Sequence, residues 1–229
     1  MIHYRQPLRT LVALGIAGTV LAAAWFAGTH VSLPEACFFP SSFIIHLIMV
    51  LGTLATARLI DRNGPVFFGF TWGQYRFHPS ILLWVLPTAL LSTLGVLSGA
   101  QDSSIPIIRD MTIPQLIAFV WIWASVSEEL LTRGLLQSLL YPSGQVTVAC
   151  RWYRSFPVIV SGLFFGAMHV VLIRSMGPRA VPIIIITTIL GFITARYRER
   201  FASLVPAIII HALFNIGGML PMWIARWIG

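Results

Sequence analysis

The chain has 229 residues, of which 57% are hydrophobic and only 10% are charged. Its mean hydropathy of +0.86 lies far above that of soluble globular domains, which excludes a soluble protein and indicates a polytopic membrane protein. The net charge of +8 comes from fifteen basic residues, all of them Arg. Because no basic run carries interleaved aromatic residues, we attribute this charge to topology-setting loops and expect no nucleic-acid partner.

Apolar runs predict an all-α, polytopic membrane bundle of seven to eight transmembrane helices, in a single membrane domain that covers residues 1–229. Most of the seven runs approach or exceed the roughly 20 residues that a spanning helix needs. The fourth and the seventh are long enough to contain a further re-entrant helix, so the count of eight stays open. The runs are Leu8–Ala27, Phe38–Ala57, Ile81–Gly99, Ile113–Leu140, Phe156–Ile173, Val181–Ala195 and Ser203–Trp227.

The arginines predict a cytoplasmic N terminus, because this orientation places ten loop arginines inside, among them Arg198, and only four outside. We interpret the first run as a retained anchor, since no convincing cleavage site follows it. The segment from Asp61 to Pro79 is interrupted by Gly and Pro and is predicted to lie at the membrane interface. Cys37 and Cys150 are expected on opposite sides of the membrane, where they could not pair.

Two adjacent carboxylates, Glu128 and Glu129, and the guanidinium of Arg133 lie inside the fourth apolar run. A charged side chain at bilayer depth costs about 2.5–3.5 kcal/mol on insertion scales, so three of them within six residues predict a functional site in a protein-lined cavity. Glu129 and Arg133 have the i, i+4 spacing of a helical ion pair. This pairing leaves Glu128 as the better base for taking a proton from water.

Three further polar residues, His169, His211 and Asn215, lie in later apolar runs. A rise of about 1.5 Å per residue places them and Glu128 at similar depth, roughly 12–20 Å from the cytoplasmic ends of their runs. His211 and Asn215 share one helix face and are suited to stabilising an oxyanion. His46, in the second run, is expected in the opposite half of the membrane, and we interpret it as structural.

Two backbone features accompany these residues. Gly162 and Gly166 form a small-residue motif, which predicts that a neighbouring helix packs closely beside His169. Pro206 lacks a backbone donor and is expected to loosen the last helix near His211.

Three motifs now stand in order on separate predicted helices, and together they resemble the CAAX prenyl protease and bacteriocin-processing family of intramembrane proteases, also called abortive-infection or Rce1-like. The region of resemblance is 113–219. The motifs are Glu-Glu-x-x-x-Arg at Glu128, Glu129 and Arg133, Phe-x-x-x-His at Phe165 and His169, and His-x-x-x-Asn at His211 and Asn215. The chain departs from the family at Thr132, where an aromatic residue is usual; we expect this difference to affect packing only.

The resemblance implies that Glu128 and His169 activate a water molecule, while His211 and Asn215 stabilise the tetrahedral intermediate. It implies catalytic involvement of Glu129 and structural support from Arg133 and Phe165. The predicted activity is hydrolysis of a peptide bond in a lipidated or membrane-anchored protein or peptide at the lipid bilayer. The small size implies a prokaryotic inner-membrane member, for which peptide maturation or sorting-anchor processing is more typical than prenyl-protein processing.

Three alternatives remain open from the sequence. The residues form a complete general-base set without a cofactor, but Glu128, His169 and His211 could instead bind zinc. A non-catalytic bacteriocin-immunity or scaffold protein could retain the same fold. A proton-coupled transporter would use membrane Glu and His residues as relays, although no internal repeat supports it.

Overall fold

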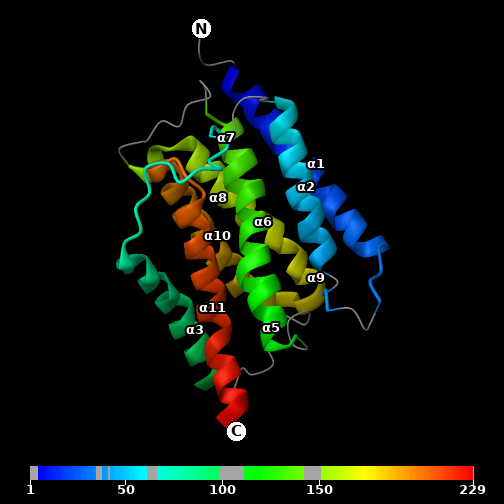
Figure 1. Ribbon diagram of the computed structural model, residues 1–229, viewed down its shortest axis with the longest axis vertical. Helices are drawn as coiled ribbons and strands as arrows, with labels where there is room; N and C mark the ends of the chain where they lie inside the picture. The colour runs from blue at the N-terminus through cyan, green and yellow to red at the C-terminus, as the bar shows by residue number, and fades with distance from the viewer. Residues whose placement is uncertain are drawn as a thin grey trace.

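The computed structural model describes residues 5–34, 38–40, 42–60, 66–97, 111–141 and 151–228. Every regular element within these ranges is helical, as predicted, and the helices form a bundle around one central helix (Figure 1). Cys37 and Cys150 lie outside the described ranges, as does most of the predicted outer loop between the third and fourth runs.

Two long helices, α1 (Arg5–His30) and α2 (Ser42–Ile60), pack as a hairpin on one side of the bundle (Figure 1). Small residues permit their close approach. A Cβ atom on Gly52 of α2 would lie 3.0 Å from Val20 of α1, and one on Gly28 would overlap Ile45. Three alanines of α1 are buried in the core between this hairpin and the rest of the bundle: Ala13, Ala17 and Ala24.

The central helix runs from Ile113 to Leu139 as consecutive segments without a break. Two of these, η3 (Leu116–Ala124) and η4 (Leu130–Leu136), are π-helical and enclose the short segment α6 (Ser125–Glu129). The π-helical hydrogen-bond pattern is rare and occurs frequently at functional sites. The remaining segments are α5 (Ile113–Gln115) and α7 (Gln137–Leu139).

A second hairpin is formed by α8 (Phe156–Met168) and α10 (Ala180–Phe201), which share more contacts than any other pair of elements among the described residues. The chain reverses at Gly177, which has a positive φ of 58° that glycine accommodates without strain. The short elements between the two helices are η6 (His169–Leu172), α9 (Ile173–Met176) and η7 (Gly177–Arg179).

The predicted small-residue contact lies within this second hairpin. A Cβ atom on Gly166 would lie only 1.9 Å from Thr188 Oγ1, and one on Gly162 would lie 2.4 Å from the ring of Phe192. The two backbones therefore approach more closely than larger residues would allow, as the motif predicts.

The last helix, α11 (Val205–Ile228), packs against η1 (Pro79–Val85) and α3 (Leu86–Leu97). Thr88 of α3 donates a hydrogen bond to the carbonyl of Phe214, at 2.8 Å. The expectation that Pro206 loosens α11 is wrong. Pro206 is the second residue of the helix, where its missing N–H is not needed for the hydrogen-bond ladder.

The segment 66–78 is irregular, as predicted, but packs tightly against the turn between α10 and α11. Gln74 N donates to the carbonyl of Phe201 at 3.0 Å, and Leu204 N donates to the carbonyl of Gly69 at 3.0 Å. Phe68 and Tyr75, which belong to this segment, are buried. This segment closes one end of the bundle.

Arg198, which the sequence placed in a cytoplasmic loop, lies instead within α10 and is fully buried. Its Nη2 donates to the carbonyl of Phe67, at 2.8 Å, and to Ser138 Oγ, at 3.3 Å. Gly69 has a positive φ of 80°, and a Cβ atom there would lie 2.5 Å from Arg198 Nε. Arg198 is buried because α10 continues past the apolar run into polar residues, which segment 66–78 covers.

A neighbouring buried network surrounds Glu199. Its Oε2 accepts hydrogen bonds from Tyr141, at 3.2 Å, and from Ser155, and its Oε1 pairs with Arg196 at 2.6 Å. Burial raises the pKa of Tyr141, so the phenol keeps the proton that it donates. The central helix, α8 and α10 are thereby joined at this end of the bundle.

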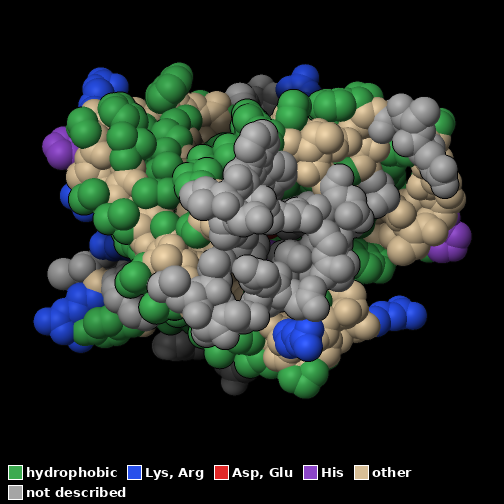
Figure 2. Space-filling view, turned by 90° about the horizontal axis from the view of Figure 1, so that it is seen from below, with side chains coloured by type: hydrophobic (Ala, Val, Ile, Leu, Met, Phe, Trp, Pro, Cys, Tyr) green, Lys and Arg blue, Asp and Glu red, His purple; other side chains and the backbone are tan. Residues whose placement is uncertain are grey.

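In the part of the chain that the structure describes, three helical stretches are long and apolar enough to cross a membrane: Gln6–His30, Ser42–Ile60 and Phe156–Phe201. The third contains the α8–α10 hairpin, and two shorter apolar helices, Pro79–Leu94 and Val205–Pro221, accompany them. The predicted count of seven to eight spans is therefore not confirmed. Large hydrophobic side chains are exposed on several helices, among them Leu8, Leu11, Leu51, Leu54, Leu83 and Leu90. In Figure 2, hydrophobic side chains lie around the grey atoms, and Arg side chains lie toward the margin.

Candidate active site

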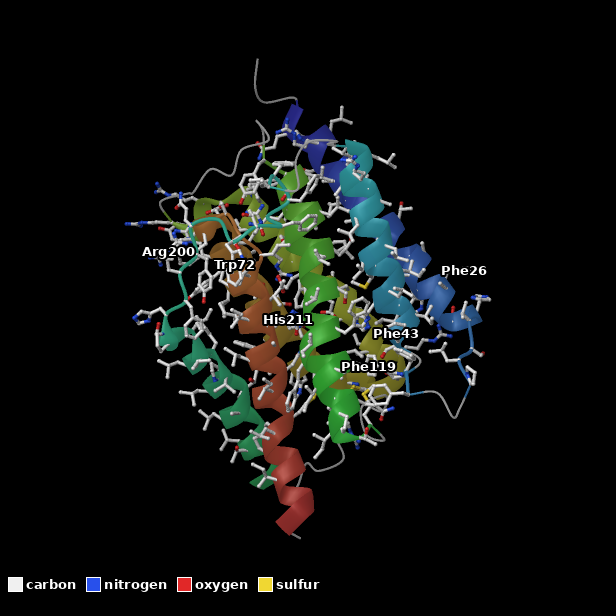
Figure 3. All side chains as sticks on the ribbon, in the orientation of Figure 1. Phe26, Phe43, Trp72, Phe119, Arg200 and His211 are labelled. Carbon is white, nitrogen blue, oxygen red and sulfur yellow. The ribbon has the colours of Figure 1, made fainter. Side chains whose placement is uncertain are left out.

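Glu128 and Glu129 lie on α6, in the middle of the central helix and between its two π-helical segments. The side chain of Glu128 is 13% exposed, whereas that of Glu129 is completely buried. His211 on α11 lies in the interior of the bundle beside them (Figure 3). The two carboxylates are therefore adjacent in sequence but occupy different environments.

Three histidines surround the carboxylate of Glu128. The Nε2 atom of His46 is 3.4 Å from Oε1, while the Nε2 atoms of His211 and His169 are 3.8 and 4.0 Å from Oε2. Oε2 is buried and accepts no hydrogen bond from the side chains that the structure describes. The residues that the first two motifs predict as base and partner are thus brought together, with one carboxylate oxygen unengaged.

Glu129 takes part in a separate set of contacts. Its Oε1 lies 3.0 Å from Nδ1 of His211, and its Oε2 lies 3.2 Å from Nε of Arg133. The predicted i, i+4 ion pair is therefore present. Arg133 is also fixed by the carbonyl of Gly191, at 2.9 Å, and by the ring of Phe165, 4.3 Å from its guanidinium carbon.

Phe165 is buried between the two catalytic-motif histidines. Its ring centroid is 5.0 Å from that of His169 and 5.3 Å from that of His211. The carbonyl of Phe165 also accepts a hydrogen bond from Nδ1 of His169, at 2.8 Å, which directs the opposite nitrogen toward Glu128. Phe165 therefore contacts both histidines and Arg133, and its supporting role stays a prediction.

Asn215 reaches the central helix closer to its N terminus than His211 does. Its amide donates to the carbonyl of Val120, at 3.2 Å, and to Ser125 Oγ, at 3.1 Å. Ser125 lies one helical turn before Glu128. His211 and Asn215 therefore face the same helix, as their spacing predicts, but contact it at different levels.

The expectation that His46 lies far from the cluster is wrong. The depth estimate assumed that neighbouring runs start at the same height, but α2 starts beside Phe119 and Trp123, about two to three turns into the central helix. The ring of Phe43 lies 5.8 Å from that of Phe119 and 5.7 Å from that of Trp123 (Figure 3). This offset brings His46, less than one turn further along α2, level with Glu128.

Thr132 makes hydrogen bonds in addition to the packing contacts that we expected. Its hydroxyl donates to the carbonyl of Glu128, at 2.6 Å, and accepts a hydrogen bond from Nη1 of Arg133. A residue that departs from the family pattern thus contacts two residues of the first motif.

For a metal ion, the fit can be judged from the donor atoms. No group of three or more His, Cys, Asp or Glu residues in the described part of the chain is arranged to hold an ion. Zinc would need nitrogen and oxygen ligands that converge on one point at about 2.0–2.2 Å. Glu128, His169 and His211 would have to move together to bind it.

Part of the chain matches a known protein family. Residues 111–217 match the family model of the type II CAAX prenyl endopeptidase Rce1-like proteins. Comparison with curated proteins and comparison with solved structures both give no match. The family match supports assignment of the chain to the CAAX protease family, through a domain that spans just under half of its residues. The family and the apolar helices together point to an integral membrane protein with CAAX-type intramembrane protease activity.

Proposed function

We propose that the protein is a metal-free intramembrane endopeptidase that hydrolyses a peptide bond in a lipidated or membrane-anchored protein or peptide. The observation that carries this proposal is the position of Glu128 Oε2, which is buried, accepts no hydrogen bond from described residues and faces two histidines. An unengaged carboxylate oxygen beside imidazole nitrogens suits a general base that activates water.

In the proposed reaction, the attacking water lies between Glu128 Oε2 and Nε2 of His169. Glu128 takes one proton from the water as the water oxygen bonds to the peptide carbonyl carbon, and the carbonyl oxygen becomes an oxyanion. The proton then passes to the amide nitrogen as the C–N bond breaks, which yields a carboxylic acid and an amine. The acid then gives its proton to the amine, which leaves a carboxylate and an ammonium group. This sequence needs no further reactant.

His211 is proposed as the principal oxyanion donor, through Nε2. Glu129 fixes its ring by the contact with Nδ1, and Arg133 fixes Glu129 in turn. Asn215 is proposed as a second donor, but its amide must first turn away from Val120 and Ser125. We therefore expect His211→Ala to lower kcat by about 10² to 10³, and Asn215→Ala by a smaller factor.

The experiment compares the native protein with Glu128→Gln in liposomes, using an internally quenched peptide that ends in a farnesylated Cys-aliphatic-aliphatic-X sequence. In parallel, mass spectrometry of cell membranes lists the protein termini that change in the mutant. His30→Gln is a matched control, because His30 is an exposed histidine at the end of α1. Loss of cleavage in Glu128→Gln but not in His30→Gln supports the proposal.

Two outcomes would contradict parts of the proposal. If a chelator abolishes cleavage and zinc restores it, the site is a zinc site. If Glu128→Gln changes neither the peptide cleavage nor any terminus, and still complements deletion of the protein, the peptidase proposal fails and the immunity or scaffold alternative replaces it.

A further inference from the structure

His46 reaches the proposed active site from α2, a helix outside the region 111–217 that matches the family. Its side chain is 14% exposed, close to the 13% of Glu128, and its Nε2 lies 3.4 Å from Glu128 Oε1. Its other nitrogen, Nδ1, lies 2.9 Å from the carbonyl of Ser42, one turn earlier on the same helix. The ring is therefore fixed at both edges.

The contact with Ser42 decides which edge of the ring faces Glu128. A carbonyl can only accept a hydrogen bond, so Nδ1 carries the hydrogen of this contact. Nε2 then faces Oε1, and the hydrogen bond between them requires a proton shared by the two atoms. The two oxygens of Glu128 consequently differ: Oε1 is held by His46, and Oε2 faces His169 and His211.

We propose that His46 is a positioning residue, which holds Oε1 of Glu128 and thereby aims Oε2 at His169 and His211. This inference rests on the proposed function, since it assigns a partner to the proposed base. Within the described residues, His46 makes no hydrogen bond or ring contact with His169 or His211, so its effect passes through Glu128.

The contact of Nδ1 with the carbonyl four residues earlier does not by itself explain why His46 faces Glu128, as a comparison with His30 shows. Nδ1 of His30 makes the same contact with the carbonyl four residues earlier, that of Phe26, at 2.8 Å. However, His30 is exposed and stacks on Phe26 rather than facing a carboxylate. His30 therefore makes the same helix contact without a carboxylate partner, and the contact with Glu128 is an additional feature of His46.

The test compares His46→Ala, His46→Gln and His30→Gln in the full-length protein in liposomes. The amide nitrogen of Gln reaches about as far as Nε2 of His and can donate to Oε1, whereas Ala cannot. The first readout needs no substrate: dicyclohexylcarbodiimide reacts with the protonated form of membrane carboxyl groups, and mass spectrometry locates the label. A donor that stabilises the carboxylate lowers this labelling. Glu128→Gln verifies which label belongs to Glu128.

We expect labelling of Glu128 to rise about tenfold in His46→Ala, the size of one hydrogen bond to a charged group, and to stay near the native rate in His46→Gln and His30→Gln. Equal labelling in all variants overturns the inference. Equal labelling of His46→Ala and His46→Gln, both above native, also overturns it, because a positioning hydrogen bond should be restored by Gln.

The second readout is kinetic, with the farnesylated peptide as the probe. We expect His46→Ala to lower kcat about tenfold with little change in KM, and His46→Gln to recover most of kcat. If kcat stays native in His46→Ala while Glu128→Gln is inactive, this inference fails and the proposed function stands. If Glu128→Gln is itself fully active, the proposed function fails.

Discussion

Two neighbouring residues, Glu128 and Glu129, have different partners because a helix turns about 100° between them. Glu128 faces histidines from three other elements, at 3.4 to 4.0 Å. Glu129 faces inward, where it contacts Arg133 and His211 and is completely buried. Adjacent carboxylates can in this way serve two purposes, with one available for chemistry and the other neutralising a buried guanidinium.

Glu129→Gln should destabilise the protein far more than Glu128→Gln does. Removing one partner of a buried ion pair leaves the other charge uncompensated, at a cost of about 3–5 kcal/mol. Thermal unfolding of the two purified variants in the same detergent measures the difference. The double variant Arg133→Met with Glu129→Gln should recover stability, because it removes the uncompensated charge. Equal melting temperatures for Glu128→Gln and Glu129→Gln would show that the Arg133 charge does not depend on Glu129.

At the scale of elements, the α8–α10 hairpin determines where His169 lies. Gly166 is three residues before His169, and its contact with Thr188 sets the separation of the two helices. Gly191 of α10 is equally close to α8, since a Cβ atom there would lie 2.7 Å from the carbonyl of Gly162. The carbonyl of Gly191 also accepts the hydrogen bond from Arg133. Helix packing and the position of the site are therefore coupled.

Gly166→Ala should destabilise the protein by about 1–3 kcal/mol, because the added methyl group overlaps Thr188 and forces the helices apart. The double variant with Thr188→Gly should recover part of this loss, since it removes the overlapping side chain. Gly18→Ala on α1 is the control, because nothing lies within 4 Å of its added Cβ atom. Thermal unfolding checks all three variants, and an unchanged melting temperature in Gly166→Ala would contradict the close contact.

At the scale of the whole molecule, the central helix links two different ends of the bundle. Thr112 precedes its first turn, and Ser138 near its last turn contacts the buried Arg198. The central helix is not one of the three candidate spans, but its length is on the order of 40 Å, and we predict that it crosses the hydrocarbon core of the bilayer. Arg200, exposed two residues after Arg198, should therefore lie on the opposite side of the membrane from Thr112.

Cysteine labelling in intact cells tests this topology. Single cysteines replace Thr112 or Arg200 in a background where Cys37 and Cys150 are changed to Ser. A membrane-impermeant maleimide should label Thr112→Cys from outside and Arg200→Cys only after the membrane is opened, if the N terminus is cytoplasmic. Labelling of both positions from the same side would contradict a spanning central helix, and the reverse pattern would place the N terminus outside.

The sequence predicts the helices well because apolar length and i, i+4 spacing are local properties. Each of the seven apolar runs overlaps a helical segment in the described residues, and the Glu129–Arg133 pair and the Gly166 contact are present as expected. The relative height of helices is not local, since loops and packing set it. For this reason the contact of His46 with Glu128, the burial of Arg198 and the orientation of the Asn215 amide were missed.

The offset between α2 and the central helix has an evolutionary consequence. The residues that define the family lie within 111–217, whereas the side chain that contacts Glu128 Oε1 comes from a preceding helix. Two relatives could keep identical motifs and still diverge at this position. Selection acting on the first hairpin could therefore adjust the reactivity of the centre while the shared domain stays unchanged, and a variant survey confined to that domain would overlook it.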